Sequence, residues 1–563
     1  MRKIAVLLIT LTFLVTTLFS MSFSSAAASH DYATALKYSI LFYDANKCGP
    51  DAAVDNVFSW RGPCHTTDGS EIGLDLTGGY HDAGDHVKFG LPQAYAAAVL
   101  GWSLYEYKGV FDATGNTSKM LSTLKYFTDY LLKCHPDSNT FYYQVGDGQA
   151  DHTYWGAPEV QPGPRPVPYV ANASNAASDV CGLTSAALTI MYLNYKDIDQ
   201  NYANKCLKAA KELYTMAKTN LGYYAENAFY ISHSYWDDLS FAATWLYVVE
   251  KDPTYLKEID SYLSNKTLWG ESPFNNKWTM CWDDMYMAVF CKLAEITGEQ
   301  KYIDAMNYNL DYWMNSLNTT PGGLKYLDSW GVLRYAAAEA FIAMRYYELT
   351  KNEALKSFAK SQIDYILGSN PINMSYVIGY GSNYPKCPHH RAANGYTYAN
   401  GDNAKPAKNL LLGALVGGPN MSDNFIDDVN QFQFTEVAID YNAAFVGALA
   451  AIEKYYGNIV IPTPPATTPP SPTATPSLIW CDVGDLNADG SINSVDITYM
   501  KRYLLRSISV LPYQENERIR IPAADTNGDG AINSSDMVLL KRYVLRSISE
   551  FPVKYDIYGN VIN

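Results

Sequence analysis

Two aspartates lie three residues apart in the segment "GGYHDAGDHVKFG", residues 78–90. Asp82 and Asp85 each adjoin a histidine, and glycines bracket the segment. Glycine disfavours both helix and strand, so we expect both carboxyl groups on a loop. Hydrolysis of a glycosidic bond requires two carboxyl groups, one to protonate the leaving oxygen and one to activate water or attack carbon. This pair can supply half of that chemistry, although most loop carboxylates are solvated or structural groups.

Two further stretches place reactive side chains in loops. The segment "FIDDVNQFQFTEVAIDYNAAF" holds Glu436 directly before an apolar helical pattern, with Asp427 upstream. The segment "PKCPHHRAANG" holds His389 and Arg391 among proline and glycine residues. A distant glutamate can face a loop aspartate across a sugar, whereas two aspartates on one loop are less suited to straddle it. The sequence therefore predicts an acid and a base from separate segments.

The composition excludes several kinds of partner. The 563 residues carry a formal net charge of −15, which argues against nucleic acid and anionic membranes. Arg2 and Lys3 precede an apolar run at 4–19 and then small residues, the pattern of an export signal over residues 1–28. An uncleaved membrane anchor is the alternative, but no later apolar run is long enough to span a bilayer. We expect a soluble protein that is secreted to the extracellular space.

The chain divides at a stretch rich in proline and threonine. The segment "IPTPPATTPPSPTATPS", residues 461–477, predicts an extended linker, which we assign to residues 458–478. It separates a large domain at 29–457 from a small module at 479–556 and a tail at 557–563. The large domain contains about twelve segments with apolar residues at i, i+3, i+4 and i+7, and few alternating strands. This pattern predicts an all-α domain in which helices pack in layers.

The small module contains a repeat that predicts two calcium loops. "DLNADGSINSVDITYMKRYLLRSIS" begins at residue 485 and "DTNGDGAINSSDMVLLKRYVLRSIS" at residue 525. Each opens with oxygen-bearing residues at EF-hand spacing, which wraps hard ligands round one ion. Recurrence in register argues against a chance acidic turn. The predicted ligands are Asp485, Asn487, Asp489, Ser491 and Asp496 in the first loop, and Asp525, Asn527, Asp529, Ala531 and Asp536 in the second, where Ala531 offers its backbone carbonyl.

This repeat departs from an ordinary EF-hand, since position 12 is aspartate and one helix follows each loop. In that form the module resembles a type I dockerin, which binds the cohesin domains of a cellulosomal scaffoldin. The resemblance implies a small α-helical module that holds two calcium ions, and its near-duplicate faces imply binding in two orientations. The positions that match cohesin-recognition sites or lie close to them are Ser494, Val495, Lys501, Arg502, Ser534, Ser535, Lys541 and Arg542.

The three loop segments together resemble family 9 glycoside hydrolases, which are mainly cellulases of (α/α)6-barrel fold. The resemblance implies that Asp85 is the general base, that Asp82 helps to hold the water and that Glu436 is the general acid of an inverting reaction. It adds Asp427 and His389 to the catalytic group. The implied substrate-binding residues are Arg391, His152, Trp155, Trp278, Trp330, Arg334 and Tyr441. For each tryptophan the alternative is a core indole rather than a face that stacks on sugar.

The segment before Glu436 departs from that family pattern. Val429, Gln431, Phe432 and Thr435 replace residues that are common in the family at those positions. We expect altered contacts with substrate subsites rather than lost catalysis.

Two metal sites are predicted in the large domain. Cys48, Cys64, His65 and His86 offer two sulfurs and two imidazoles for a tetrahedral zinc ion, in an order that some family members share. His81 is the alternative fourth ligand, and a Cys48–Cys64 disulfide is the alternative to any metal. The stretches "SYWDDLSF" and "CWDD" resemble a family calcium site, although acidic helix N-termini explain them equally well. Its candidate ligands are Ser234, Asp237, Asp238 and Asp283.

These features together predict a secreted, cellulosome-docked endo-β-1,4-glucanase that acts with inversion and whose catalytic unit is monomeric. An inactive glucan-binding subunit is one alternative. An enzyme specific for another β-glucan, such as mixed-linkage glucan or xyloglucan, is the other.

Overall fold

The computed structural model describes residues 30–225, 228–267, 270–396, 405–457, 459, 482–487, 489, 491–508, 510–515, 523–555 and 561–562. The chain forms two compact units that divide between Pro462 and Thr463, within the predicted linker. The predicted export signal, nearly all of the linker and most of the tail lie outside the described residues. Within those residues, no helix has the length and apolar character needed to cross a membrane.

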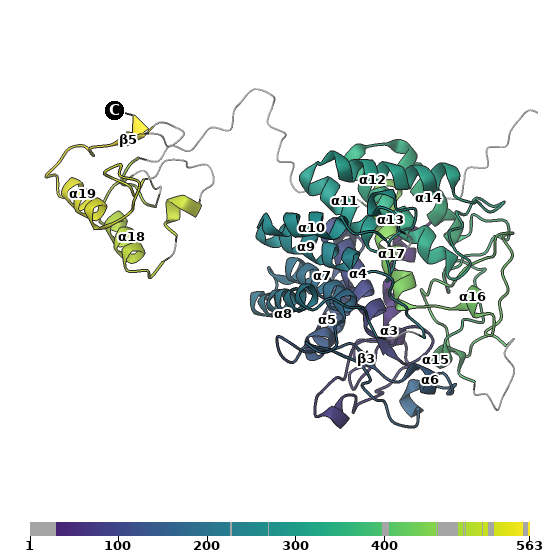
Figure 1. Cartoon of the computed structure of the whole chain (residues 1–563). Helices are drawn as coiled ribbons and strands as arrows, with labels where there is room; N and C mark the ends of the chain where they lie inside the picture. The colour runs from purple at the N-terminus through teal and green to yellow at the C-terminus, as the bar shows by residue number, and fades with distance from the viewer. Residues whose placement is uncertain are drawn as a thin grey trace, which may run out of the picture. The chain divides into compact units, whose positions relative to one another are not determined.

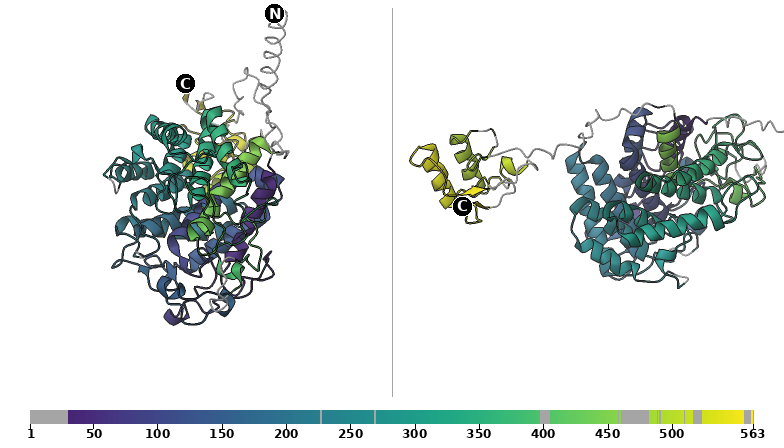
Figure 2. Two further views of the ribbon diagram at one scale, coloured as in Figure 1. Left: turned by 90° about the vertical axis from the view of Figure 1, so that its right-hand side faces the viewer. Right: turned by 90° about the horizontal axis from the view of Figure 1, so that it is seen from above.

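A closed ring of six helices forms the centre of the first unit (Figures 1 and 2). Each helix contacts the next, and the last returns to the first, so that the ring closes. These helices are apolar on most sides because they are covered on both faces. They are α4 (Gly90–Ala113), α7 (Ser178–Tyr195), α9 (Trp236–Glu250), α11 (Tyr286–Thr297), α13 (Val332–Thr350) and α17 (Ile439–Tyr456).

An outer helix packs on each inner helix and covers it from solvent. In α8, Ala203, Cys206, Ala210, Leu213 and Ala217 are buried at spacings of three and four residues, which places them on one face. The predicted layered all-α fold is confirmed, and ring closure makes it an (α/α)6 barrel. The outer helices are α2 (Tyr32–Leu41), α5 (Thr117–Lys133), α8 (Gln200–Thr219), α10 (Thr254–Leu263), α12 (Gln300–Asp311) and α14 (Glu353–Leu367).

Short elements shape the loops at one end of the barrel, where Figure 1 shows α3, α6, α15 and β3 gathered together. Strand β1 (Lys88–Phe89) pairs antiparallel with β3 (Gln144–Val145), and β2 (Phe141–Tyr142) pairs with β4 (Val170–Ala171). Because β1 follows Asp85 within three residues, this ladder fixes one end of the aspartate loop. The other short elements of this unit are α3 (Tyr43–Asn46), η1 (Ser70–Ile72), α6 (Gly148–Asp151), η2 (Pro158–Val160), η3 (Pro273–Asn275), η4 (Tyr312–Ser316), α15 (Arg391–Asn394) and α16 (Phe432–Thr435).

The second unit is built on two similar helices, α18 (Ser494–Leu504) and α19 (Ser534–Val544). The residue at position 12 of each acidic loop performs two tasks. Asp496 accepts hydrogen bonds from the backbone of Leu486, which closes the loop, and of Asn493, which caps α18. Asp536 repeats the capping arrangement at α19. Met500 and Leu540 are buried in the small core, and η6 (Pro512–Glu515), β5 (Lys554–Tyr555) and β6 (Val561–Ile562) complete the unit.

The barrel core holds one acidic side chain that gives stability a pH dependence. Glu339 of α13 is fully buried, and burial raises its pKa to about 8, an effect that the Thr279 hydroxyl partly offsets. The folded state therefore keeps this proton at pH values where the unfolded state loses it. Since the unfolded state then binds fewer protons, the free energy of unfolding falls as pH rises from about 4.5 towards 8.

We expect Glu339→Gln to remove the contribution of this carboxyl group to the pH dependence of stability, because an amide does not ionise. At one pKa unit per 1.36 kcal/mol, the wild type should lose about 5 kcal/mol relative to the variant between pH 4.5 and 8. Denaturant unfolding of both proteins at several pH values in this range measures the difference. Parallel stability curves would show that Glu339 is not the group responsible.

Candidate active site

One cavity of about 370 Å³ collects eight of the residues predicted from the sequence. They come from segments as distant as residues 82 and 441, which the barrel brings to the same end of its helices. The eight are Asp82, Asp85, His152, Trp330, Arg334, His389, Glu436 and Tyr441. The cavity is also lined by Ala83, Gly84, Phe89, Ala228, Phe229, Tyr230, Trp282 and Ala438.

Backbone contacts hold the loop that carries the two aspartates. The side-chain amide of Asn46 donates to the carbonyl oxygens of His81 and Ala83 at 3.1 and 2.8 Å. Gly84 lies so close to the backbone of His389 that an added Cβ would sit 2.1 Å from its carbonyl oxygen. Glycine is therefore required here, and the loop conformation follows from packing rather than from regular secondary structure.

The two aspartates are buried and only partly hydrogen-bonded. The Tyr230 hydroxyl donates to Oδ2 of Asp82, and the Ala83 amide donates to Oδ1 of Asp85 at 3.1 Å. The second oxygen of each carboxyl group is buried and has no partner in the described part of the chain. Buried polar atoms are normally paired, so unpaired ones at a cavity suit the binding of a water or substrate hydroxyl.

Burial raises the pKa of both carboxyl groups. For Asp82 the neighbouring charge of Asp85 adds to the effect, and for Asp85 the charge of Asp151 does so. A carboxylate with a raised pKa is a stronger base than an ordinary aspartate. The loop is therefore suited to remove a proton from water.

Glu436 lies between α16 and α17 and receives two hydrogen bonds on one oxygen. The indole of Trp330 and the hydroxyl of Tyr441 donate to its Oε2 at 2.7 and 2.8 Å. Both donors use Oε2, so Oε1 is the oxygen through which Glu436 can pass a proton to a leaving group. This arrangement suits a general acid.

The residues that depart from the family pattern pack beside Glu436. Phe432 contacts the rings of Trp330 and His389, with centroids 5.1 and 5.9 Å apart. The Val429 carbonyl accepts from Nδ1 of His389 at 2.6 Å, which leaves Nε2 without the ring proton. The Thr435 hydroxyl donates to the Asp428 carbonyl at 3.0 Å. The altered subsite contacts expected from these residues remain a prediction.

Four predicted site residues do not line the cavity. Asp427 accepts from the amides of Lys386 and Cys387 at 2.7 and 2.8 Å, so it holds the segment that leads to His389 and is not placed to act on substrate. Trp155 packs edge-on against His389 at 5.1 Å.

The other two lie behind or beside the cavity. Arg391 is buried and forms an ion pair with Asp151 at 2.5 Å, so its charge is compensated within the protein. Trp278 packs edge-on against Tyr335 and lines a neighbouring cavity of about 400 Å³. Trp282 lines both cavities and connects the two along one surface.

Sequence reasoning missed Tyr230, Phe229 and Trp282. The aromatic pair lies in "AFYISHS", which contains no charged residue to attract attention, and Trp282 lies in the "CWDD" segment that was interpreted only as a calcium motif. Aromatic residues beside acidic motifs are the signal that could have found them, since sugars stack on such faces.

A group of four ligand atoms lies beside the aspartate loop. Cys48, Cys64, His65 and His81 place one sulfur or ring nitrogen each within 4.8 Å of one another. Nδ1 of His65 lies 3.0 Å from Nε2 of His81 and 3.5 Å from the sulfur of Cys48. A tetrahedral zinc ion separates its nitrogen and sulfur ligands by about 3.4–3.8 Å, so the donor set fits. The described cysteines are all free, which removes the Cys48–Cys64 disulfide as an alternative in this structure.

The assignment of His86 to this group requires correction. The structure places His81 there, which was the alternative ligand, whereas Nδ1 of His86 lies 3.1 Å from the side-chain oxygen of Gln161. His81 and His86 flank the same loop, and the direction of each imidazole depends on a backbone path that the sequence does not reveal. The backbone of His65 adopts φ 48°, in the left-handed region that is strained for a residue other than glycine.

The predicted calcium ligands near α9 do not form such a group among the described residues. Asp237 and Asp238 are buried in the first turn of α9, and burial raises the pKa of both. Burial also raises the pKa of Asp283 to about 7. The Ser234 hydroxyl lies 3.2 Å from the hydroxyl of Tyr286. Calcium at these residues remains a prediction.

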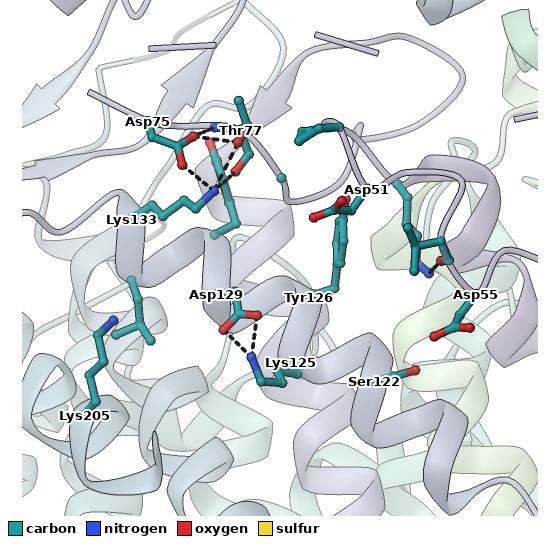
Figure 3. Close-up of a pocket in the computed structure, with 16 residues that line it drawn as sticks. Asp51, Asp55, Asp75, Thr77, Ser122, Lys125, Tyr126, Asp129, Lys133 and Lys205 are labelled. Carbon is teal, nitrogen blue, oxygen red and sulfur yellow. Dashed lines mark hydrogen bonds and ion pairs between the residues drawn. The ribbon is translucent and has the colours of Figure 1, made fainter. Parts of the chain in front are cut away.

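A larger cavity of about 950 Å³ lies along α5 (Figure 3). Two of its carboxylates are already neutralised, because Lys133 pairs with Asp75 at 2.9 Å and Lys125 with Asp129 at 2.7 Å. It lacks the buried, unpaired carboxyl oxygens of the smaller cavity. Size alone therefore does not identify the catalytic site.

Comparisons with known proteins agree with this geometry. The family model of glycosyl hydrolase family 9 matches residues 32–449, and that of the dockerin type I domain matches residues 483–545. Endoglucanase A of Bacillus pumilus is 42% identical over 455 residues, which are 76% of this chain and 67% of that protein. Endoglucanase 14 of Arabidopsis thaliana is 36% identical over 482 residues, with 77% and 96% covered.

A solved structure extends the comparison to three dimensions. The cellulase Cel9M of C. cellulolyticum is 62% identical, with a TM-score of 0.74, and the match covers 77% of this chain and 100% of that one. Both resemblances inferred from the sequence are confirmed. A family match over most of the chain, on the same barrel, shows that this protein belongs to glycosyl hydrolase family 9 and is an endoglucanase that carries a type I dockerin domain.

Proposed function

We propose that this endoglucanase hydrolyses internal β-1,4 bonds of cellulose with inversion at the anomeric carbon. The observation that carries the proposal is the single cavity that holds two buried, partly unpaired aspartates and a glutamate from a distant segment. An inverting reaction needs a base and an acid on opposite sides of the sugar, with room for one water. Carboxyl groups from separate segments meet that need.

In this mechanism Glu436 protonates the leaving oxygen while Asp85 takes a proton from the attacking water. The water oxygen forms the new bond to the anomeric carbon as the glycosidic bond breaks. Asp82, with one oxygen fixed by Tyr230, uses the other to orient the water. After one turnover Asp85 holds a proton and Glu436 has lost one, so exchange with solvent restores the enzyme.

The aromatic lining supports a glucan substrate. Trp330 is 40% exposed, and Trp330, Phe229 and Trp282 line the cavity, where flat faces can stack on pyranose rings. The Cel9M structure was also solved with cellobiose, at 63% identity and a TM-score of 0.75 to this chain. Structures of endoglucanase CelQ from Clostridium thermocellum, 39% identical with a TM-score of 0.68, contain cellotriose.

The second unit supports secretion and attachment to a cellulosome. A type I dockerin implies a cohesin partner, and we place the contact on the first turns and basic ends of α18 and α19. Val495 is 45% exposed, which leaves an apolar side chain available at the predicted recognition position of α18. Calcium in both loops would neutralise the carboxylates that converge there.

A structural zinc ion is the second proposed metal. Its ligands would be Cys48, Cys64, His65 and His81. Its role would be structural, because it would cross-link the segment after α3 to the aspartate loop.

We expect Glu436→Gln and Asp85→Asn each to lower kcat on a soluble cellulose derivative by about 10²–10⁴-fold, because each removes one proton-transfer group. Activity of the wild type should fall on the acid side at a pH above the ordinary range for aspartate, since the base must be ionised and its pKa is raised. Asp129→Asn, in the other cavity, is the matched control and should keep wild-type activity.

Proton NMR of fresh product should show α-configured ends, and β-configured ends would contradict inversion. Faster release of reducing sugar from mixed-linkage glucan or xyloglucan than from the cellulose derivative would favour another β-glucan as substrate.

Removal of calcium with EGTA should unfold the dockerin and abolish cohesin binding, because its acidic loops repel one another without the ion. Hydrolysis of the soluble substrate should largely survive in the same sample. Circular dichroism of the dockerin and a pull-down on immobilised cohesin measure the two effects. Glu550→Gln, at an exposed acid outside both loops, is the control, and tight cohesin binding in excess EGTA would contradict the proposal.

We expect purified enzyme to contain about one equivalent of zinc, which Cys64→Ser and His81→Ala should each remove, since a structural site needs all four ligands. His86→Ala should retain the metal. Elemental analysis measures the content. A metal-free wild type, or zinc loss in His86→Ala alone, would overturn this ligand assignment.

A further inference from the structure

Gln161 lies immediately after η2, between the metal cluster and the catalytic loop, and no motif singled it out. Its side-chain nitrogen donates to Oδ1 of Asp151 at 2.7 Å. Its side-chain oxygen lies 2.9 Å from Nε2 of His65 and 3.1 Å from Nδ1 of His86. One amide therefore contacts both a cluster residue and the neighbour of the general base.

The orientation of this amide is determined by Asp151. That carboxylate forms an ion pair with Arg391 at 2.5 Å, so it accepts hydrogen bonds and donates none. The amide nitrogen of Gln161 must face it, which directs the amide oxygen towards the two imidazoles. A flipped amide would place its oxygen against a carboxylate oxygen of Asp151 and lose the hydrogen bond between them.

That orientation in turn determines which nitrogen of His65 carries the proton. The Gln161 oxygen only accepts, so Nε2 of His65 must carry the hydrogen and donate it. Nδ1 is then left with a free lone pair, and it faces the sulfur of Cys48 and the ring of His81. A metal ligand is commonly fixed in this way by the hydrogen bond at its other ring nitrogen.

The opposite end of the connection reaches the catalytic loop. Oδ2 of Asp151 accepts from the backbone amide of His86 at 3.2 Å as well as from Arg391. That amide belongs to the peptide bond that follows Asp85, so Asp151 restrains the main chain of the base. Gln161 and Asp151 thus form a continuous path of hydrogen bonds from the cluster to Asp85.

We infer that Gln161 is a positioning residue that couples the metal cluster to the general base: the same amide selects the ligand tautomer of His65 and, through Asp151, fixes the peptide of Asp85. This inference rests on the proposed function, since it assumes that Asp85 acts as base and that the cluster binds zinc. It goes further in making base geometry and metal affinity depend on a residue that touches neither metal nor substrate.

Two substitutions in the full-length enzyme separate the two ends of the connection. Gln161→Met keeps the size but neither donates nor accepts, so zinc affinity and kcat should each fall about 10- to 100-fold. Gln161→Glu can still accept from both imidazoles, so zinc affinity should stay within about threefold of wild type. Its carboxylate cannot donate to Asp151 and repels it, so kcat should fall as in Gln161→Met. KM should change little in both, because the substrate-lining residues are intact.

Zinc affinity is measured by competition with a chromogenic chelator, and kcat and KM on a soluble cellulose derivative. Gln362→Met is the matched control, since Gln362 is also buried and accepts from the Lys325 amide, far along the chain in α14. It should leave zinc affinity and kcat unchanged whatever it does to stability.

Wild-type zinc affinity and kcat in Gln161→Met would overturn the inference, as would parallel loss of both quantities in Gln161→Glu. A wild-type enzyme that binds no zinc would overturn the part of the inference that concerns zinc affinity, together with the proposed zinc site itself. A wild type without activity on any β-glucan would instead refute the proposed function, so the two failures are distinguishable.

Discussion

Direct backbone contact between three distant segments is the constraint on which this active site depends. The Gly84 carbonyl accepts from the Arg391 amide at 3.1 Å, and the Asp82 carbonyl accepts from the Ile439 amide at 2.9 Å. The His389 amide donates to the Thr435 carbonyl at 2.9 Å, which joins the third segment to the second. Because these are main-chain bonds, they fix the positions of the proposed base and acid before any side chain is considered. The barrel supplies the rigid helix ends that make such contacts reproducible.

The site retains groups that an ordinary core would exclude. Asp82 and Asp85 are buried beside each other, and their desolvation is unfavourable for folding. His65 adopts a strained backbone conformation next to them. Buried charged groups and strained backbone conformations concentrate at functional sites, where the surrounding structure must offset their free-energy cost. Here the surrounding structure is an extensively packed barrel. The packing of helices that take no part in the chemistry therefore offsets this unfavourable free energy.

Much of the fold followed from local patterns, and much of the site did not. Apolar spacing predicts the helices because a helical face must be buried by residues three and four apart. It does not predict ring closure, which depends on the contact between α17 and α4, two helices that lie far apart in the sequence. Asp85 and Glu436 were accessible through their motifs. Tyr230, Asp151 and Gln161 were not, since each role depends on a contact with a residue 65 or more positions away. The exchange of His81 for His86 has the same origin, because ring direction is a property of the folded loop.

The position of the proposed metal follows from the length of the segment that it ties down. Residues 47–87 run from α3 to β1 with only the short helix η1 among them. A segment of that length has too little regular structure to fix its own path, and closing it carries an entropic cost. The proposed ligands at residues 48, 64, 65 and 81 would divide it into shorter loops, the last of which ends one residue before Asp82. A metal cross-link there would restrain the proposed base from its N-terminal side, while the hydrogen bond between Asp151 and the His86 amide restrains it from the C-terminal side. The metal ligands and the proposed base would therefore be held by one structural unit, with separate contacts on the two sides of the aspartate loop.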